Sequence, residues 1–139
     1  LRLVGSEMCI RDSSWPVHCR AESDGAAFHD GFATVVDRLD AIFRKGRYAA
    51  AYSGFEGALA GGDESLASWL RDGGVGSVDV VGIATDHCVR ATALDAVREG
   101  FATRVLLGMT AGVAADSTDA ALTTMRDAGV ELVGQPVVG

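Results

Sequence analysis

A cysteine stands where an apolar run gives way to a helical pattern. The run from Val78 to Ala84 is rich in β-branched residues and nearly continuous, which is typical of a strand buried on both faces. After it, apolar residues recur every three or four positions as far as Gly100, which predicts a helix that ends at this glycine. Cys88 is therefore expected in the first turn of that helix, at the carboxyl end of the strand.

This position suits a cysteine that does chemistry. The backbone N–H groups and the positive dipole end of a helix N-terminus stabilise a thiolate, which is the nucleophilic form of cysteine. Open α/β sheets also bind their ligands outside the carboxyl ends of the strands. The residues alone leave an alternative open, because unpaired cysteine is among the residue types most often buried for packing.

Strand and helix patterns alternate before this point in the chain. Residues 41–45 predict a short strand, and residues 46–57 predict a polar loop. A helix follows the stretch AGGDES and is expected to have a Ser or Asp cap. Its inward-facing residues are predicted to be Leu66, Trp69 and Leu70.

The C-terminal part continues the alternation. Residues 103–112 predict a strand that runs into a loop. The helix after it is predicted to be capped by Asp116 or Ser117 and to end at Gly129, and residues 130–133 predict the last strand. Strands that alternate with helices imply βαβ units, a parallel sheet and right-handed crossovers.

The composition limits the classes of partner. The chain has 139 residues, of which 48% are hydrophobic and 22% are charged, and this predicts one soluble globular domain. The net charge of -7 argues against nucleic acid or an anionic membrane surface and favours a small neutral or cationic molecule. The 3 cysteines form no C-x-x-C pair, so neither a disulfide framework nor a zinc knuckle is indicated, and a reducing cytoplasm is expected.

The first residues stand apart from the rest. Residues 1–12 show no sustained period of either kind, and the stretch LRLVGSEMCIRDS resembles translated sequencing-adapter read-through. We expect these residues to be a non-native leader, and we assign them no helix or strand. The first residue is Leu1 rather than Met, which favours a fragment of a longer protein.

Three separated motifs together resemble a known family. They are SSWPVHC at residues 13–19, KGRYAAAYSGFEG at residues 45–57, and the long stretch from VDVVGIATDHC to ADST at residues 78–118. In this order they are similar to the bacterial nicotinamidases and pyrazinamidases of the isochorismatase-like cysteine hydrolases. The resemblance runs from Ser13 to about Val133. It implies an α/β fold with a parallel sheet flanked by helices, in a Rossmann-like three-layer arrangement.

The resemblance implies a role for the cysteine. Cys88 would be the nucleophile that attacks the carboxamide carbon of nicotinamide, and water would open the resulting thioester to nicotinate. Pyrazinamide would be a second substrate. The peptide bond between Ile83 and Ala84 would be cis, and the N–H groups of Ala84 and Cys88 would form the oxyanion hole.

Two further residues match charged or metal-binding positions of the family. Lys45 matches the catalytic lysine, whose ammonium would hold the cysteine and its base in their charged forms. Taken alone, it would be a solvated lysine at a strand end. His18 matches a ligand of a divalent transition metal (Zn, Fe or Mn), which the family holds with one Asp and two further His. Taken alone, it would be a surface or packed histidine.

Other residues match the substrate pocket of the family. Trp15 and Tyr52 match aromatic residues that flank the pyridine ring, although plain packing would also explain either one. His87 lies beside the nucleophile and is expected to line the pocket. Asp86 is better explained as a cap of the helix that carries Cys88.

The chain also departs from the family pattern. The first two strands of the family sheet carry a D-x-Q-x-D-F segment with the general base and a D-x-H segment with metal ligands, and neither has a match here. Asp12 is the only aspartate in residues 1–12 and comes too late in the chain to be that base. We therefore expect residues 13–139 to be a partial hydrolase domain that lacks these two strands, has an incomplete metal site and is inactive as it stands.

Two alternative functions remain open from the sequence. Amidases of the carbamoylsarcosine or maleamate type in the same family also keep the cysteine, whereas isochorismatases lack it. A non-catalytic α/β domain that binds a small molecule, or senses oxidants through Cys88, is the second alternative. Neither the metal nor the oligomeric state follows from the sequence. The expected partner is nicotinamide, with no nucleic acid and no membrane.

Overall fold

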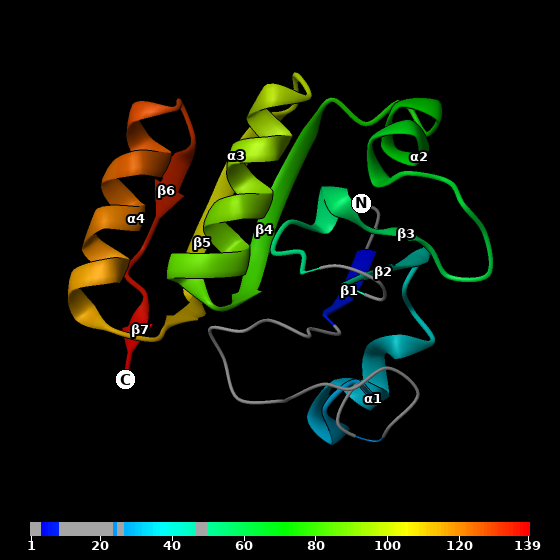
Figure 1. The fold of residues 1–139 in the computed structure, drawn as a ribbon, viewed down its shortest axis with the longest axis horizontal. Coiled ribbons are helices and arrows are strands. Elements are labelled where there is room, and N and C mark those ends of the chain that lie inside the picture. Colours follow the sequence, from blue (N-terminus) through cyan, green and yellow to red (C-terminus); the bar gives the residue numbers. More distant parts are fainter. Residues whose placement is uncertain (1–3, 9–23, 25–26, 47–49) are drawn as a thin grey trace. The chain divides into compact units, whose positions relative to one another are not determined.

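The computed structural model describes residues 4–8, 24, 27–46 and 50–139, and of residues 4–8 it describes the backbone. The chain divides into two compact units, Leu1–Leu66 and Ala67–Gly139, whose elements are shown in Figure 1. A membrane-spanning helix is absent from these described ranges, because none of their helices combines the length and the apolar character that a bilayer requires.

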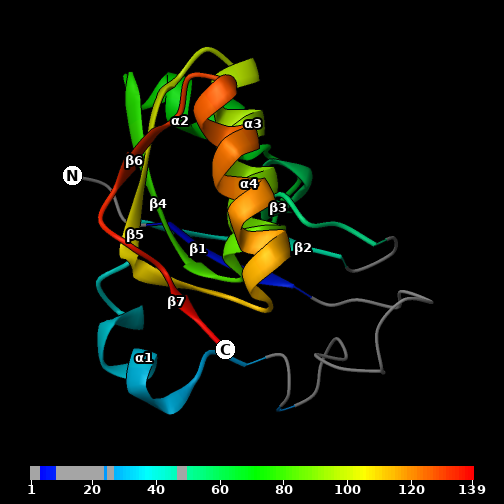
Figure 2. The same cartoon turned by 90° about the vertical axis from the view of Figure 1, so that its left-hand side faces the viewer.

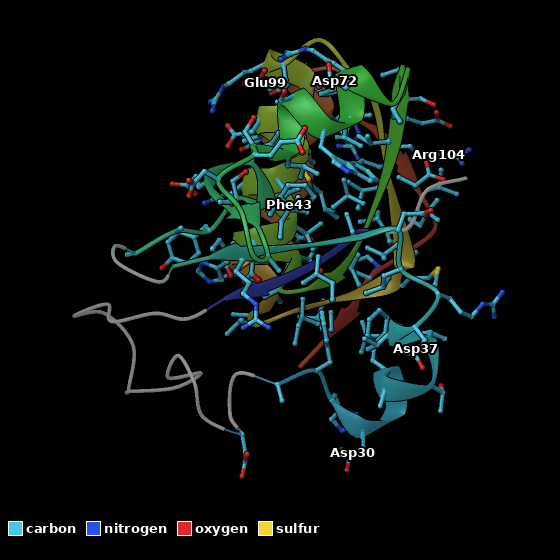
Figure 3. The ribbon with its side chains drawn as sticks, turned by 90° about the vertical axis from the view of Figure 1, so that its right-hand side faces the viewer. Asp30, Asp37, Phe43, Asp72, Glu99 and Arg104 are labelled. Atoms are coloured by element: carbon cyan, nitrogen blue, oxygen red, sulfur yellow. The ribbon has the colours of Figure 1, made fainter. Side chains whose placement is uncertain are left out.

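The first unit is built on a short three-stranded sheet. Strand β1 (Val4–Met8) runs parallel to β2 (Ala41–Lys45), and β3 (Ala58–Leu59) pairs with β2 in the antiparallel direction. Helix α1 (Asp30–Val36) precedes β2, and a 3-10 turn (Gly54–Glu56) precedes β3. Phe43, at the centre of β2, is fully buried and is labelled in Figure 3. The strand predicted for residues 41–45 is confirmed.

Strand β1 forms where the sequence analysis assigned no element. Its residues pair in register with the whole of β2, from Val4 opposite Ala41 to Met8 opposite Lys45. Parallel pairing is made by backbone N–H and C=O groups, which every non-proline residue carries, so a strand of this length needs no hydrophobic period. The origin of residues 1–12 as a non-native leader stays a prediction.

The second unit has a parallel sheet with its helices on one face. Strands β4 (Ser77–Ile83), β5 (Ala102–Gly112) and β6 (Glu131–Val133) pair in that order, and β7 (Val137–Val138) pairs with the end of β5. The two connecting helices, α3 (Arg90–Arg98) and α4 (Ala115–Asp127), lie beside each other in Figure 1, and Figure 2 shows both of them on the same side of the sheet. Within this unit the predicted alternation and the parallel direction of the strands are confirmed.

The core of the second unit lies between this sheet and the two helices. Its buried members come from α3 and the residue before it, from β5, from the inner face of α4 and from the residue before β6. They are Val89, Ala93, Val105, Leu107, Ala121, Met125 and Val130. Burying side chains of this kind is worth about 1.5–3 kcal/mol for each large one, so this cluster supplies the main stabilisation of the unit.

Helix α2 (Leu66–Asp72) buries most of the predicted face. Leu66 and Leu70 are buried, whereas Trp69 is half-buried. Arg71 of this helix donates to the side chain of Glu99 at 2.6 Å and to its backbone carbonyl at 2.9 Å. Glu99, labelled in Figure 3, follows α3, so this pair ties the C-terminal ends of α2 and α3 together.

The prediction that the strand at residues 78–84 is buried on both faces is wrong for β4. Burial alternates along the strand, and Val81 and Ile83 are 46% and 76% exposed. The reason is that α3 and α4 cover one face of the sheet in the described part of the second unit. On the other face Arg104 (labelled in Figure 3) donates to both carboxylate oxygens of Asp79, at 2.8 and 2.7 Å.

The predicted stops of the helices are confirmed, but a predicted cap is wrong. Gly100 and Gly129 end α3 and α4 with φ values of 89° and 90°, which a glycine adopts without strain. Helix α4 begins at Ala115 with no side-chain cap, so neither Asp116 nor Ser117 caps it. The hydroxyl of Ser117 donates instead to Asp86, at 2.5 Å.

We predict that Gly112→Ala destabilises the second unit by about 1–3 kcal/mol, as overpacking of a core typically does. A Cβ at this position would lie 2.0 Å from the buried hydroxyl of Thr118. That hydroxyl sits on a stiff β-branched side chain, so it cannot move away freely. Urea unfolding gives the change in the free energy of unfolding.

Two variants make this prediction specific. Gly108→Ala lies in the same strand, where a new Cβ meets nothing within 4 Å, and it should change the free energy of unfolding little. Thr118→Ala removes the clashing oxygen, which has no hydrogen-bond partner among the described residues, and it should restore part of the loss. Equal losses in Gly108→Ala and Gly112→Ala would contradict the packing argument.

Candidate active site

The turn that carries the cysteine follows directly after β4. Residues Thr85–Val89 form a single π-helical turn, in which the N–H groups of His87 and Val89 donate to the carbonyl of Ala84 at 3.1 and 3.0 Å. Cys88 is a buried thiol, 8% exposed. Its predicted place, in the first helical turn at the carboxyl end of a strand, is confirmed. The Ile83–Ala84 peptide bond is cis, as the resemblance implies.

Asp86, in the same turn, accepts hydrogen bonds from the segment between β5 and α4 and from the first turn of α4. Its carboxylate is 1% exposed and accepts from the N–H of Val113 at 3.0 Å, the N–H of Ala114 at 3.4 Å and the hydroxyl of Ser117 at 2.5 Å. Burial alone would raise the pKa of Asp86, but the hydrogen bonds from Ser117 and Val113 outweigh burial and hold this pKa below its usual value of 3.8.

The sequence interpretation of Asp86 as a cap of its own helix is wrong. The N-cap residue of the turn is Ala84, and no side chain caps the turn. The first N–H groups of a helix lack partners within the helix, and the start of α4 offers such donors. Asp86 satisfies donors there, 27 and 28 residues further along the chain. The sequence carries no signal for a pairing between segments so far apart.

A second buried hydrogen bond holds the turn against β5. The hydroxyl of Thr85, which is fully buried, donates to the hydroxyl of Thr110 at 2.9 Å. Thr110 in turn donates to the carbonyl of Leu107 at 3.0 Å. The two residues at the start of the turn therefore bind two different segments, the end of β5 and the beginning of α4. This contact could not be predicted from the sequence either, because threonine in a strand is ordinarily explained by its β propensity.

Lys45 lies at the end of β2 in the first unit. It is 5% exposed, and its ammonium donates to the backbone carbonyl of Tyr52. It is therefore a buried residue, not the solvated strand-end lysine that its sequence context alone would suggest. Tyr52 itself is half-buried and precedes the 3-10 turn. Because Lys45 belongs to the first unit and Cys88 to the second, their convergence stays a prediction.

The remaining predicted site residues divide into two groups. Trp15 and His18 lie outside the described residues. His87 is described and is half-buried, with its Nε2 atom 3.9 Å from the carboxylate of Asp86. Across residues 24, 27–46 and 50–139, no group of three or more His, Cys, Asp or Glu side chains is placed to hold a metal ion. These residues alone therefore do not provide the metal site that the resemblance implies.

Comparison with known proteins supplies the family. A family model described as the isochorismatase domain matches residues 7–136. The chain belongs to this family. It is 60% identical over 121 residues to a nicotinamidase/pyrazinamidase of Mycobacterium tuberculosis, a match that covers 87% of this chain and 63% of the relative. The chain thus spans less than two thirds of that relative's length.

Two solved structures have a similar fold. One is PnC1 from L. infantum in complex with nicotinate, with a TM-score of 0.82 and 33% identity over 99% of this chain and 75% of the other. Another is a pyrazinamidase of Pyrococcus horikoshii in complex with zinc, with a TM-score of 0.76 and 31% identity over 95% of this chain and 74% of the other. The predicted isochorismatase-like α/β fold is therefore confirmed.

We predict that Asp86→Asn makes the free energy of unfolding less dependent on pH at acidic pH. A carboxyl group whose folded pKa is lowered stabilises the fold at pH values above its unfolded pKa, and this stabilisation is lost as the pH falls through the folded pKa. The free energy of unfolding of the unmodified chain should therefore decrease below about pH 4. The decrease should be smaller in Asp86→Asn. Urea unfolding between about pH 2 and pH 7 measures it.

Asp79→Asn is the matched control for this prediction. Its hydrogen bonds from Arg104 also lower the pKa of Asp79, but this pair is exposed, so salt screens it. In about 1 M NaCl the acid dependence that Asp79→Asn removes should shrink, while the part that Asp86→Asn removes should persist. If the free energy of unfolding falls equally at low pH in Asp86→Asn and in the unmodified chain, the stabilising role of the Asp86 carboxylate would be refuted.

Proposed function

We propose that the protein of which this chain forms part is an amidohydrolase that converts nicotinamide to nicotinate and ammonia, and that it also acts on pyrazinamide. The observation that carries the proposal is the 60% identity over 121 residues to a nicotinamidase/pyrazinamidase. Within the matched region, Cys88 lies at the carboxyl end of β4, where α/β enzymes place their ligands. Residues 13–139 form part of a longer hydrolase domain in this proposal.

The proposed reaction has two covalent steps. The thiolate of Cys88 attacks the carboxamide carbon, the C–N bond breaks, and the amine leaves as ammonia after it takes up a proton. The product is a thioester between Cys88 and the nicotinoyl group. Water then attacks the same carbon, the C–S bond breaks, and nicotinate leaves with the thiol restored.

Named residues support these steps in the proposal. The N–H groups of Ala84 and Cys88 stabilise the oxyanion of each tetrahedral intermediate. The ammonium of Lys45 holds the cysteine and its base in their charged forms. Trp15, Tyr52 and His87 bind the pyridine ring.

A divalent transition metal, either Zn, Fe or Mn, completes the proposed site, with His18 as one ligand. Support comes from the zinc held by the Pyrococcus horikoshii pyrazinamidase. When bound, such a metal would orient the substrate. We place the reaction in the cytoplasm, because 3 cysteines without a C-x-x-C pair fit a reducing compartment.

The test measures ammonia release from nicotinamide by the protein of which this chain forms part (the longer protein). The same assay is run on its Cys88→Ala and Cys88→Ser variants. Both substitutions remove the nucleophile, so turnover should fall by about 10³-fold or more. Both variants should remain folded, and their unfolding midpoints should differ from that of the unmodified protein only by the amount that a small buried substitution causes. Turnover that persists unchanged in Cys88→Ala would refute the proposal.

Substrate choice is tested in the same assay with pyrazinamide, N-carbamoylsarcosine and maleamate beside nicotinamide. Nicotinamide and pyrazinamide should be hydrolysed with the largest values of kcat/KM, because the pocket aromatics favour a flat heteroaromatic ring. Preference for a linear amide would support the carbamoylsarcosine-type or maleamate-type alternative instead.

The proposed metal ligand gives a separate prediction. His18→Ala should lower the metal content of the purified longer protein, as measured by elemental mass spectrometry, because one imidazole ligand is lost. His29→Ala is the matched control. The ring of His29 accepts from the N–H of Gly31 at 3.0 Å as the cap of α1, so its loss should leave the metal content unchanged. Equal metal content in His18→Ala and the parent would exclude His18 as a ligand.

A further inference from the structure

The turn after Tyr52 presents a carboxylate to a peptide group that also binds Lys45. The Oε2 atom of Glu56 accepts from the N–H of Ser53 at 2.8 Å and from the N–H of Tyr52 at 3.0 Å. The carbonyl of Tyr52 accepts from the ammonium of Lys45. The N–H of Ser53 and the carbonyl of Tyr52 belong to the same peptide group. One planar amide therefore has a carboxylate at its N–H end and an ammonium at its C=O end.

The geometry of the turn is fixed by further contacts. The hydroxyl of Ser53, which is 1% exposed, accepts from the N–H of Phe55 at 3.1 Å, and together with Glu56 it forms a capping box. At Gly57 a Cβ would lie 3.0 Å from the carbonyl oxygen of Arg44, the residue before Lys45. The turn therefore lies directly against the end of β2, and a side chain at Gly57 would push it away.

We propose that Glu56 is a positioning residue for Lys45 and acts through the Tyr52–Ser53 peptide group. A hydrogen bond from the N–H to a carboxylate increases the negative charge on the carbonyl oxygen of the same amide. The bond from the ammonium to that oxygen becomes stronger, and the long lysine side chain is held in one conformation. The value of this arrangement for catalysis rests on the proposed function, in which Lys45 acts beside the cysteine.

Few other charged groups face Lys45 from the described elements packed against β2. Strand β3 carries only Ala58 and Leu59. Arg44 precedes Lys45 in the strand and is exposed, so it lies on the opposite face. The titratable groups on the turn and its preceding residue are Glu56 and the phenol of Tyr52. Strand β1 pairs with β2 through its backbone, and its acidic residue, Glu7, has the register position opposite Arg44.

The experiment measures how fast an amine reagent modifies Lys45. Acetic anhydride labelling of the 139-residue chain is followed at the Lys45 peptide by mass spectrometry over a range of pH. Glu56→Gln keeps the shape of the side chain but removes its charge, so the midpoint of the labelling profile should move to lower pH by about half a unit. Glu56→Asp restores the charge and should move the midpoint back toward the parent value.

Two controls separate charge from loop order. Glu64→Gln removes the same charge from the loop after β3 and should leave the Lys45 midpoint unchanged. Ser53→Ala removes the hydroxyl that accepts from Phe55 but keeps the carboxylate, so its midpoint should change less than that of Glu56→Gln. An unchanged midpoint in Glu56→Gln, or an equal shift in Glu64→Gln or Ser53→Ala, would overturn the proposal.

A kinetic arm connects the contact to the reaction. In the longer protein, Glu56→Gln should lower kcat for nicotinamide by about threefold with little change in KM, because it acts on a catalytic group rather than on substrate binding. If the unmodified longer protein releases no ammonia while the labelling midpoints shift as expected, the proposed function fails and the positioning role of Glu56 stands. If the parent is active and the midpoint in Glu56→Gln does not move, the positioning role fails alone.

Discussion

The geometry at the carboxyl edge of the second unit's sheet depends on the hydrogen bonds that the carboxylate of Asp86 accepts. A parallel sheet brings the carboxyl ends of β4 and β5 to the same edge, but it leaves the turns beyond those ends without fixed partners. Asp86 supplies the fixed partner, because it binds two backbone N–H groups and one hydroxyl at the start of α4. A buried charge is tolerated only when it is hydrogen-bonded in this way. The position of Cys88, two residues later, follows from that anchor.

Lys45 is held by the same physical means within the first unit. Its ammonium is buried, and a buried charge without a partner would be costly, so the Tyr52 carbonyl provides an acceptor. The acceptor is itself fixed, because Glu56 and Ser53 close the turn around it. In both units a charged side chain is therefore bound to main-chain atoms of a segment that follows it in sequence. Main-chain partners keep their identity under substitution, so such anchors depend on backbone position more than on neighbouring side chains.

The sequence predicted what depends on local pattern. The strand before Cys88, the helix after it and the glycines that end α3 and α4 follow from hydrophobic period and from glycine's freedom at positive φ. The contacts of Asp86 and Thr85 could not be predicted, since they join segments 25 to 31 residues apart. Strand β1 was missed for a related reason, because pairing through backbone groups requires no hydrophobic period in the sequence. Motif resemblance located Cys88 and Lys45, but not what holds them.

The wrong prediction for β4 shows what an apolar run does and does not report. Val78 and Val80 are partly buried on the helix side, whereas Val81 and Ile83 are exposed on the other. A run of β-branched residues therefore indicates a strand, because such side chains favour extended backbone, but burial depends on which elements cover each face. The exposed face also changes character along the strand, from the Asp79–Arg104 ion pair near its amino end to Ile83 at its carboxyl end. Contact with water is favourable for the charged side chains at the amino end of this face and unfavourable for the apolar side chains at its carboxyl end. The apolar end is the one that adjoins the turn of Cys88, because only Ala84 separates Ile83 from the first residue of that turn.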